Sequence, residues 1–373
     1  MQRFRSKPRP DWPKTVESQG LLFHSPEGET YWDESAYYRF TASEIDAIEK
    51  ASGALNDMCL AAVQRVIDEN RFADFGLSPA FANYVARSWD RDEITIYGRF
   101  DLAFDGHSPP KLLEYNADTP TALLEAAVIQ WHWMKDCFPN LGQFNSIHER
   151  LIEAWGRVKQ TLPGPMYFTC LSGNIEDYMT VTYLRDTAIQ GGLRTEYLPV
   201  EQIGWNVGRG QFVDLREQHI DNCFKLYPWE WMLKEAFGPN LLADNTRWLE
   251  APWKMLLSNK AILALLWEMF PQSPYLLPAS LEPLDGDYVR KPTLAREGAN
   301  VQTVVGGRVV SETEGIYPGP WVYQKLHPIP RFDGNYAVVG SWMVNGYACG
   351  IGVREDATPV TGDTSRFVPH VFG

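Results

Sequence analysis

The feature that most constrains this chain is a charged pair of alternating segments at residues 98–118. Polar and apolar side chains alternate in Gly98–Asp101 and again in Lys111–Asp118. Between them, Asp105–Pro110 is rich in turn-forming residues. This pattern predicts a β-hairpin over about residues 93–117. Because side chains two apart on a strand share a face, several charged groups are expected on one surface of the hairpin.

One register of this hairpin gathers two carboxylates, an amide and a guanidinium. In that register Asp101 lies opposite Glu114. Arg99 then lies opposite Asn116, and Phe104 pairs with the first residue of the second strand. Like charges that face each other on a sheet repel, so a cation is expected between the carboxylates, and such oxygen ligands suit Mg²⁺. The same pattern also fits an ordinary solvated hairpin face.

Length and charge exclude several classes of protein. A chain of 373 residues can form one large domain or two to three subdomains. The formal net charge of −13 argues against a nucleic-acid-binding surface, which needs positive charge. Residues 1–13 lack the apolar core of a secretory signal, and the most apolar helix candidate, 261–270, is too short to cross a bilayer. Five scattered cysteines without a CxxC pair predict free thiols, so we expect a cytoplasmic protein with no membrane partner.

Hydrophobic periodicity predicts an α/β chain, with α+β layers. The predicted helices cover residues 42–70, 119–135, 145–160, 176–191 and 259–270. The predicted strands after the hairpin cover residues 166–171, 194–199, 223–227, 287–291, 301–305, 321–327, 336–344 and 347–354. Residues 166–199 form a β-α-β unit in this interpretation, and residues 1–40 form an ordered arm on the core.

Three local patterns sharpen these expectations. Thr41 and Glu44 form a capping box at the start of the first long helix. Thr119 is expected as an N-cap, which would place Asp118 at a helix N-terminus that favours anions. Asn345-Gly346 is typical of a type I′ turn between the last two strands.

Two segments allow both a structural and a functional interpretation. The aromatic stretch 223–231 fits a core strand and equally the wall of a substrate pocket. The basic, glycine-containing loop 293–300 lies between two predicted strands and fits a flap over phosphate groups. Neither a Walker-type loop nor a GxGxxG dinucleotide motif is present.

Cations from later segments complete a pattern that suits a nucleoside triphosphate. Lys260 lies at a helix start, Lys291 at the end of a strand, Arg296 in the flap and Arg354 in the last predicted strand. With the hairpin carboxylates, these groups would hold a metal, neutralise phosphates and stabilise charge that develops during transfer.

Several ordered motifs carry a family resemblance across nearly the whole chain. They are RFD at 99–101, LLEYNADTPT at 112–121, LYPWEWM at 226–232, NKAILALLWEMFP at 259–271, YVRKPTLAREGANV at 288–301 and VYQKLHPIPRFDGNY at 322–336. In these motifs the chain resembles the glutathionylspermidine synthase family, and most of all its shorter bacterial acid–amine ligase members without an amidase domain. The resemblance implies an ATP-grasp-like fold that is circularly permuted, as in glutathionylspermidine and glutathione synthetases.

The resemblance also implies an activity and its ligands. A carboxylate or peptide is phosphorylated by ATP, and an amine, expected to be polyamine-like, then displaces the phosphate to form an amide. ATP and one or two Mg²⁺ ions are the implied cofactors.

The family resemblance also implies site residues, position by position. The implied Mg²⁺ ligands are Asp101, Glu114 and Asn116. The implied ATP contacts are Arg99, Phe100, Asp101, Lys260, Lys291, Arg296, Gly298, Gln324, Lys325, Leu326 and His327. Arg354 is the implied catalytic arginine, and the implied substrate contacts are Thr119, Thr121 and Glu176.

The chain departs from the family pattern in three places. The flap has Ala295 where the bifunctional enzymes have a glycine, and Glu297 where they have no acid. Val338 replaces a polar residue that often contacts the nucleotide.

We expect one ligase-like unit with three parts. Residues 1–160 would hold the arm, helices and metal-bearing hairpin, residues 161–240 a substrate-side α/β part, and residues 241–373 the nucleotide-binding part. Two other functions stay open at this point: a nucleotide-binding regulatory protein without ligation, and a carbohydrate-active hydrolase that uses paired carboxylates. The sequence does not specify the oligomeric state.

Overall fold

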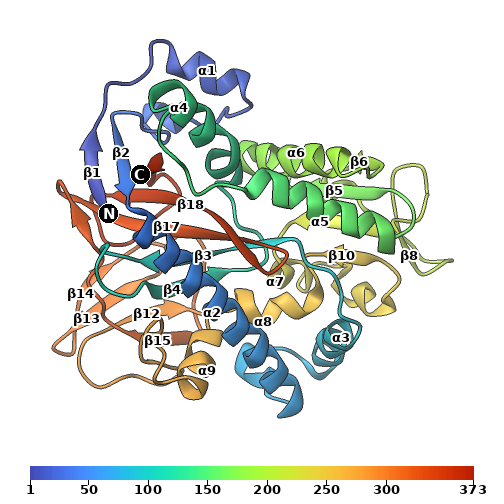
Figure 1. The fold of residues 1–373 in the computed structure, drawn as a ribbon. Helices are drawn as coiled ribbons and strands as arrows, with labels where there is room; N and C mark the ends of the chain where they lie inside the picture. The colour runs from blue at the N-terminus through green and yellow to red at the C-terminus, as the bar shows by residue number, and fades with distance from the viewer.

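A six-stranded antiparallel sheet lies at the centre of the computed structural model, which describes residues 1–373 (Figure 1). Its strands are β3 (Tyr97–Ala103), β4 (Lys111–Asn116), β16 (Arg331–Phe332), β17 (Asn335–Val344), β18 (Tyr347–Asp356) and β19 (Arg366–Val368). The strand order β19-β18-β17-β3-β4 puts the predicted hairpin beside strands from the far end of the chain. Asn345 and Gly346, between β17 and β18, have φ values of 49° and 80°, which confirms the predicted type I′ turn.

The hairpin register is confirmed where the charged residues lie. Asp101 is the partner of Glu114, and Arg99 is the partner of Asn116. A β-bulge follows directly after Asp101, so Ala103 rather than Phe104 is the partner of the first residue of β4. The extra residue shifts the turn end of the hairpin by one position and leaves the charged patch unchanged.

A four-stranded parallel sheet forms a second layer. It contains β5 (Met166–Cys170), β6 (Thr195–Tyr197), β9 (Asn222–Leu226) and β10 (Arg247–Leu249), in the order β10-β9-β5-β6. Helices α5 (Ile147–Thr161) and α6 (Ile175–Gln190) pack against it, and Trp155 of α5 contacts aromatic rings of β5 and β9. The predicted β-α-β unit is therefore confirmed, and the aromatic stretch begins as a fully buried core strand.

A third, antiparallel sheet carries the flap. Its strands are β11 (Ala279–Ser280), β12 (Tyr288–Pro292), β13 (Gln302–Val305), β14 (Arg308–Glu312) and β15 (Trp321–Lys325). Helix α9 (Ile262–Met269) packs against β11 and β15. The basic loop 293–300 connects β12 to β13, as expected, whereas β11 is too short and β14 too exposed to show a hydrophobic pattern in the sequence.

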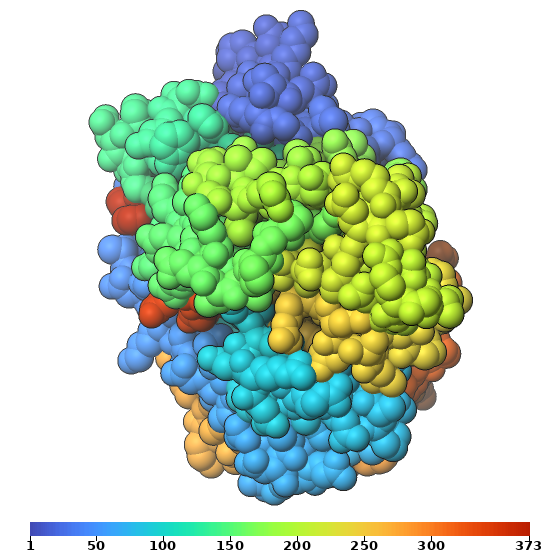
Figure 2. Space-filling view, turned by 90° about the vertical axis from the view of Figure 1, so that its right-hand side faces the viewer, coloured from blue at the N-terminus to red at the C-terminus, as the bar shows by residue number.

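The remaining elements enclose these sheets. The helices are α1 (Trp12–Ser18), α2 (Ala42–Asp68), α3 (Pro79–Asp90), α4 (Gln130–Cys137), α7 (Trp229–Met232) and α8 (Met255–Ser258). The other strands are β1 (Gln2–Arg5), β2 (Ala36–Phe40), β7 (Gly204–Asn206), β8 (Gln211–Val213) and β20 (His370–Phe372). The predicted capping box is present at the start of α2. Figure 2 shows the second layer, in green and yellow, between the dark-blue N-terminal arm and the lighter-blue helices α2 and α3.

The predicted helix 119–135 is present, but the prediction that it starts at Thr119 was wrong. Residues 119–122 are irregular, and the helix begins at Leu123, passes through a π-helical turn at Glu125–Ile129 and continues as α4. Ala122 has a φ of 62°, which is incompatible with a right-handed helix. The Thr119 hydroxyl is bonded to Arg296 instead of capping a helix, so Asp118 does not lie at a helix N-terminus.

The core and the cysteines are the last features of the fold. The buried apolar residues form two clusters, one around α2 and the first sheet and one between the second layer and the N-terminal arm. All five cysteines are free, as predicted. None of the helices combines the length and apolar character that a bilayer crossing needs.

Candidate active site

A cavity of about 570 Å³ lies where the three sheets meet, and most of the predicted site residues line it. The predicted residues in its wall are Arg99, Asp101, Glu114, Asn116, Thr119, Thr121, Lys260, Lys291, Arg296, Gly298, Gln324, Lys325, Leu326, His327 and Arg354. Phe100 is fully buried and stacks on Tyr115 on the opposite face of the hairpin. Glu176 lies just behind the wall, beside Thr121.

Arg99 and Asp101 form a buried ion pair on β3. Arg99 Nε lies 2.6 Å from Asp101 Oδ1, and Arg99 Nη2 lies 3.1 Å from Asp101 Oδ2. The same guanidinium donates to the Thr121 carbonyl at 2.8 Å. On the neighbouring strand, a Cβ atom at Gly340 would lie only 2.8 Å from Arg99 Cδ, so this close approach requires glycine. Arg354 reaches the same carboxylate, with Nη2 3.7 Å from Asp101 Oδ2.

Glu114 connects the hairpin to two lysines. Lys260 Nζ lies 3.2 Å from Glu114 Oε2, and Lys291 Nζ donates to the Leu113 carbonyl at 3.0 Å. Burial disfavours the Glu114 carboxylate, but the two lysine charges outweigh it and lower its pKa to about 2. Burial lowers the pKa of Lys291 to about 8; the Glu114 charge opposes this shift and the nearby Lys260 charge adds to it. An anionic ligand beside such a buried ammonium group would stabilise its charged form.

The donor set on the hairpin fits a hard divalent cation. The Asn116 amide nitrogen lies 3.1 Å from Asp101 Oδ2 and 3.2 Å from Glu114 Oε1, so all three side chains meet at one point. Two carboxylates and an amide supply the oxygen ligands that Mg²⁺ prefers. The hairpin contributes only two carboxylates, and no group of three or more His, Cys, Asp or Glu side chains in the chain is arranged to hold a metal ion.

The flap is held down over the cavity by three contacts. Lys260 Nζ donates to the Ala295 carbonyl at 2.6 Å. Arg296 donates to Glu230 at 2.8 Å and to the Thr119 hydroxyl, so it connects the flap to the segment that follows β4 and to α7. Gly298 has a φ of 68°, and a Cβ atom there would lie 2.6 Å from the Thr361 carbonyl. The flap therefore requires a glycine at its closest approach to the opposite wall.

The part of the cavity beside Gln324 has several apolar side chains in its wall. Gln324 is buried, accepts from Lys291 Nζ at 3.0 Å and donates to the Leu112 carbonyl at 3.0 Å. The surrounding wall is apolar and consists of Leu277, Val289, Leu326, Ile329 and Val338. Val338, which departs from the family pattern, is thus part of an apolar wall that an aromatic ring could contact.

The opposite end is acidic, and the sequence patterns revealed little of it. Asp177, Glu297 and Asp363 line the cavity, with Glu176 and Glu125 behind them. Burial, with repulsion from Glu125 and Asp363, raises the pKa of Glu176 to about 8. Burial and the Glu297 charge raise the pKa of Asp177 to about 6. These five carboxylates come from four distant segments, so no local spacing could have indicated that they meet.

Comparison with known proteins places this architecture in a family. The sequence profile of the family described as "Glutathionylspermidine synthase preATP-grasp" matches residues 3–373. The chain belongs to the glutathionylspermidine synthase family. The resemblance inferred from its motifs is therefore confirmed.

Relatives of this family member include enzymes with named ligase activities. A Haemophilus influenzae protein named "Putative acid–amine ligase" is 40% identical, over 98% of this chain and 97% of its own length. The trypanothione synthetase of Crithidia fasciculata is 29% identical, over 84% of this chain and 53% of its own length. The bifunctional glutathionylspermidine synthetase/amidase of Escherichia coli is 27% identical, over 89% of this chain and 58% of its own length.

A solved structure supports the fold. The glutathione synthetase-like effector of Globodera pallida has a TM-score of 0.55 to this chain, with 10% sequence identity and coverage of 99% of this chain and 100% of the effector. The mixed α/β fold of the glutathione synthetase type, expected from the sequence, is thereby confirmed.

Proposed function

We propose that this protein is an ATP- and Mg²⁺-dependent ligase that joins a carboxylate or peptide to a polyamine-like amine. One observation carries the proposal: a single cavity is lined by lysines and arginines at one end and by carboxylates at the other, and Arg354 is near both Asp101 and Glu297. Nucleotide and amine have opposite charges, and such a cavity attracts both to neighbouring positions.

The cationic end would bind the phosphates of ATP. Lys260, Lys291 and Arg99 supply three positive charges, and the flap covers them. The adenine ring would lie against the apolar wall beside Gln324. Asp101, Glu114 and Asn116 would hold Mg²⁺, which supplies charge neutralisation and orientation for the transferred phosphoryl group.

The proposed reaction has two steps. A carboxylate oxygen of the acid attacks the γ-phosphorus of ATP, ADP leaves, and an acyl phosphate results. The amine nitrogen then attacks the acyl carbon, the bond from that carbon to the phosphate oxygen breaks, and inorganic phosphate leaves. Arg354 would stabilise the negative charge that develops in both steps, because its guanidinium lies next to the metal-side carboxylate Asp101.

The acidic end would bind the amine. Carboxylates at Asp177, Glu297 and Asp363 attract an ammonium group, and a second ammonium of a polyamine can contact another of them. Before attack, the reacting nitrogen must lose a proton. With a pKa raised to about 8, the ionised Glu176 carboxylate is basic enough to accept this proton.

A substrate matrix tests this proposal. The protein is incubated with ATP, Mg²⁺ and pairs of carboxylates or peptides with amines, and ADP release and product mass are measured. ADP release that requires both acid and amine, together with an amide product, supports the ligase. Tight Mg·ATP binding without turnover over a broad matrix would favour a nucleotide-binding regulatory protein, and failure to bind ATP would refute both functions.

Glu114→Gln is expected to raise the Mg²⁺ concentration needed for half-maximal turnover by roughly tenfold or more, because it removes one ligand charge. The measurement is ADP release against Mg²⁺ concentration. Glu312→Gln, in the exposed strand β14, is the matched control and should leave the Mg²⁺ dependence unchanged. If ADP release depends on the Mg²⁺ concentration equally in the two variants, Glu114 is not a metal ligand.

The apparent KM for the amine is expected to fall by roughly tenfold between pH 7 and pH 9. Glu176 is mostly protonated below its raised pKa of about 8, so it gains the charge that attracts the ammonium only as the pH rises. Glu176→Gln should flatten this dependence, whereas Glu196→Gln on β6 should retain it. A pH-independent KM in the unmodified protein would contradict the assignment.

A further inference from the structure

Glu230, in the short helix α7, faces the flap from the parallel-sheet layer. Its side chain is largely buried, with 11% of its surface exposed. A small cavity of about 20 Å³ lies between α7, the flap and the segment that follows β4, and Glu230, Asp118, Lys260 and Arg296 are among its lining residues. That volume holds about one water molecule, so α7 and the flap are in close contact.

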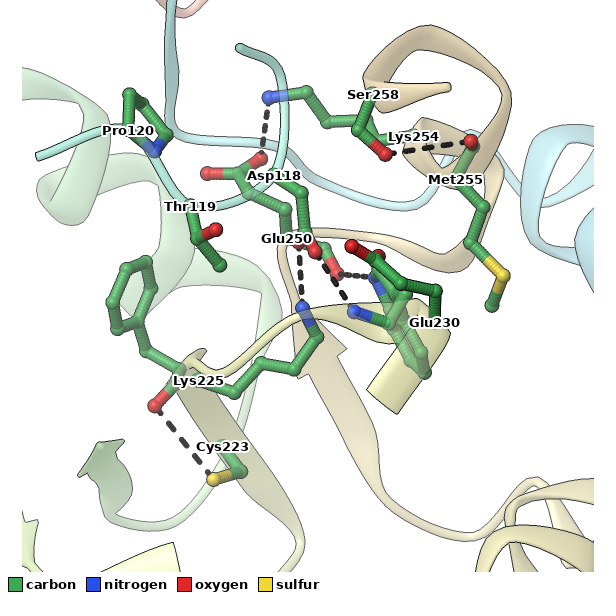
Figure 3. A network of polar contacts seen from close by, with 12 residues as sticks. Asp118, Thr119, Pro120, Cys223, Lys225, Glu230, Glu250, Lys254, Met255 and Ser258 are labelled. Atoms are coloured by element: carbon green, nitrogen blue, oxygen red, sulfur yellow. Dashed lines mark hydrogen bonds and ion pairs between the residues drawn. The ribbon is translucent and has the colours of Figure 1, made fainter. Parts of the chain in front are cut away.

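Buried hydrogen bonds fix the backbone from which Glu230 projects. The Trp229 backbone amide donates to Asp118 Oδ2 at 3.0 Å, and the Trp229 indole donates to the Glu250 carbonyl at 3.1 Å. The other oxygen of Asp118 accepts from Lys225 Nζ at 2.6 Å, and both of these side chains are fully buried (Figure 3). Because buried polar groups that satisfy one another form a rigid network, Glu230 stands on a fixed base.

Arg296 binds Glu230 from the flap. Its Nη2 lies 2.8 Å and its Nε 3.2 Å from the same carboxylate oxygen, Glu230 Oε1. Its Nη1 donates to the Thr119 hydroxyl. All other hydrogen bonds of the flap residues 293–300 stay within the third sheet and its connecting segments, or come from Lys260. Arg296 is therefore the flap residue that is hydrogen-bonded to α7.

The flap has to move when a nucleotide passes beneath it. It meets the opposite wall at Gly298, where an added Cβ atom would lie 2.6 Å from the Thr361 carbonyl. On the other side, Arg296 ties it to α7. Since the base of Glu230 is fixed, the Arg296–Glu230 ion pair has to break when this part of the flap lifts away from α7.

We propose that Glu230 is a positioning residue of the flap: its ion pair with Arg296 keeps the flap closed and limits the rates at which nucleotide enters and leaves. This inference rests on the proposed nucleotide site. Glu230 itself does not line the 570 Å³ cavity, so it touches the flap and not the nucleotide. The ion pair then stabilises the closed flap equally with and without nucleotide, and its loss speeds entry and release alike.

Stopped-flow fluorescence with a methylanthraniloyl derivative of ADP and Mg²⁺ measures both rate constants, and calorimetry with ADP measures Kd. Glu230→Gln keeps the side-chain size and removes the charge. It should raise both rate constants by about tenfold, the equivalent of roughly one charge-assisted hydrogen bond, and leave Kd within about twofold. Glu235→Gln is the matched control, because the Glu235 side chain accepts from the Tyr227 hydroxyl and has no hydrogen bond to the flap. Both rate constants should stay unchanged in it.

Arg296→Gln tests the same contact from the flap. It should also speed dissociation, and adding Glu230→Gln to it should change the dissociation rate no further, because both substitutions remove one ion pair. Circular dichroism and the melting temperature establish that each variant is folded. If Glu230→Gln does not fold, Arg296→Gln alone decides, and dissociation at the unmodified rate overturns the inference.

The outcomes separate this inference from the proposed ligase. Unchanged rate constants in Glu230→Gln, or additive effects in the double variant, overturn the role of Glu230 while the ligase proposal stands. A weaker Kd with an unchanged association rate would make Glu230 a contributor to nucleotide affinity, which overturns the inference as well. If the unmodified protein binds no nucleotide, both proposals fail.

Discussion

Replacing Arg354 with alanine is expected to lower kcat by about 10²–10³-fold while ATP still binds. The guanidinium lies 3.7 Å from Asp101 at the metal side of the cavity, where it would meet charge that exists only during the transfer steps. Lys260 and Lys291 remain in the variant and continue to attract the phosphates. The measurement pairs steady-state ADP release with nucleotide affinity from calorimetry.

Arg308→Ala is the matched control for this experiment, because Arg308 lies on the exposed strand β14 and does not line the cavity. Its kcat should equal that of the unmodified protein. If Arg354→Ala retains full turnover, Arg354 does not stabilise the transition state. If it loses ATP binding and turnover together, its contribution is to ground-state nucleotide binding instead.

Replacing Lys225 with methionine is expected to destabilise the fold by about 3–5 kcal/mol. Both Lys225 and Asp118 are fully buried, and their charges compensate each other at 2.6 Å. Methionine keeps most of the side-chain volume but leaves the Asp118 carboxylate buried with only the Trp229 backbone amide as a donor. The urea midpoint and the slope of the unfolding transition measure this loss.

The double variant Asp118→Asn, Lys225→Met separates charge from packing. An uncharged amide at position 118 can still accept from the Trp229 amide, so the double variant should recover much of the stability lost in the single one. Lys159→Met, on the exposed side of α5, controls for the loss of a lysine and should leave the midpoint unchanged. A double variant less stable than Lys225→Met would show that the charge is not the cause.

Local sequence patterns predicted the elements that carry the nucleotide end. Period-two alternation located β3 and β4, and the pairing of Asp101 with Glu114 was one of the registers that this alternation allows. The bulge after Asp101 was missed: the extra residue, Leu113, breaks the alternation of β4, so that Leu113 and Glu114 both line the cavity although they are adjacent in the sequence. The three-part division of the chain stays a prediction, although strands of the first and last parts share one sheet.

The environment of Asp118 shows what local patterns cannot supply. Thr119-Pro120 is a typical helix start, yet tertiary contacts override it: Lys225 binds the preceding carboxylate and Arg296 binds the Thr119 hydroxyl. Neither partner is near in sequence. The acidic end of the cavity was mostly missed for the same reason: Glu297 lay in the flap motif and Glu176 was an implied substrate contact, but the five carboxylates come from four segments that are distant in the sequence.

The position of β3 has a consequence for the synthesis of the chain. β3 carries Arg99 and Asp101 and pairs with β4 on one side and with β17 on the other. Because β17 begins only at Asn335, a nascent chain exposes one edge of β3 until most of the protein has been translated. β3, which carries the candidate metal ligand Asp101, therefore gains its second neighbouring strand only near the end of translation. Arg354, on β18, is synthesised later still. Incomplete chains thus lack the arginine proposed to stabilise the transfer steps.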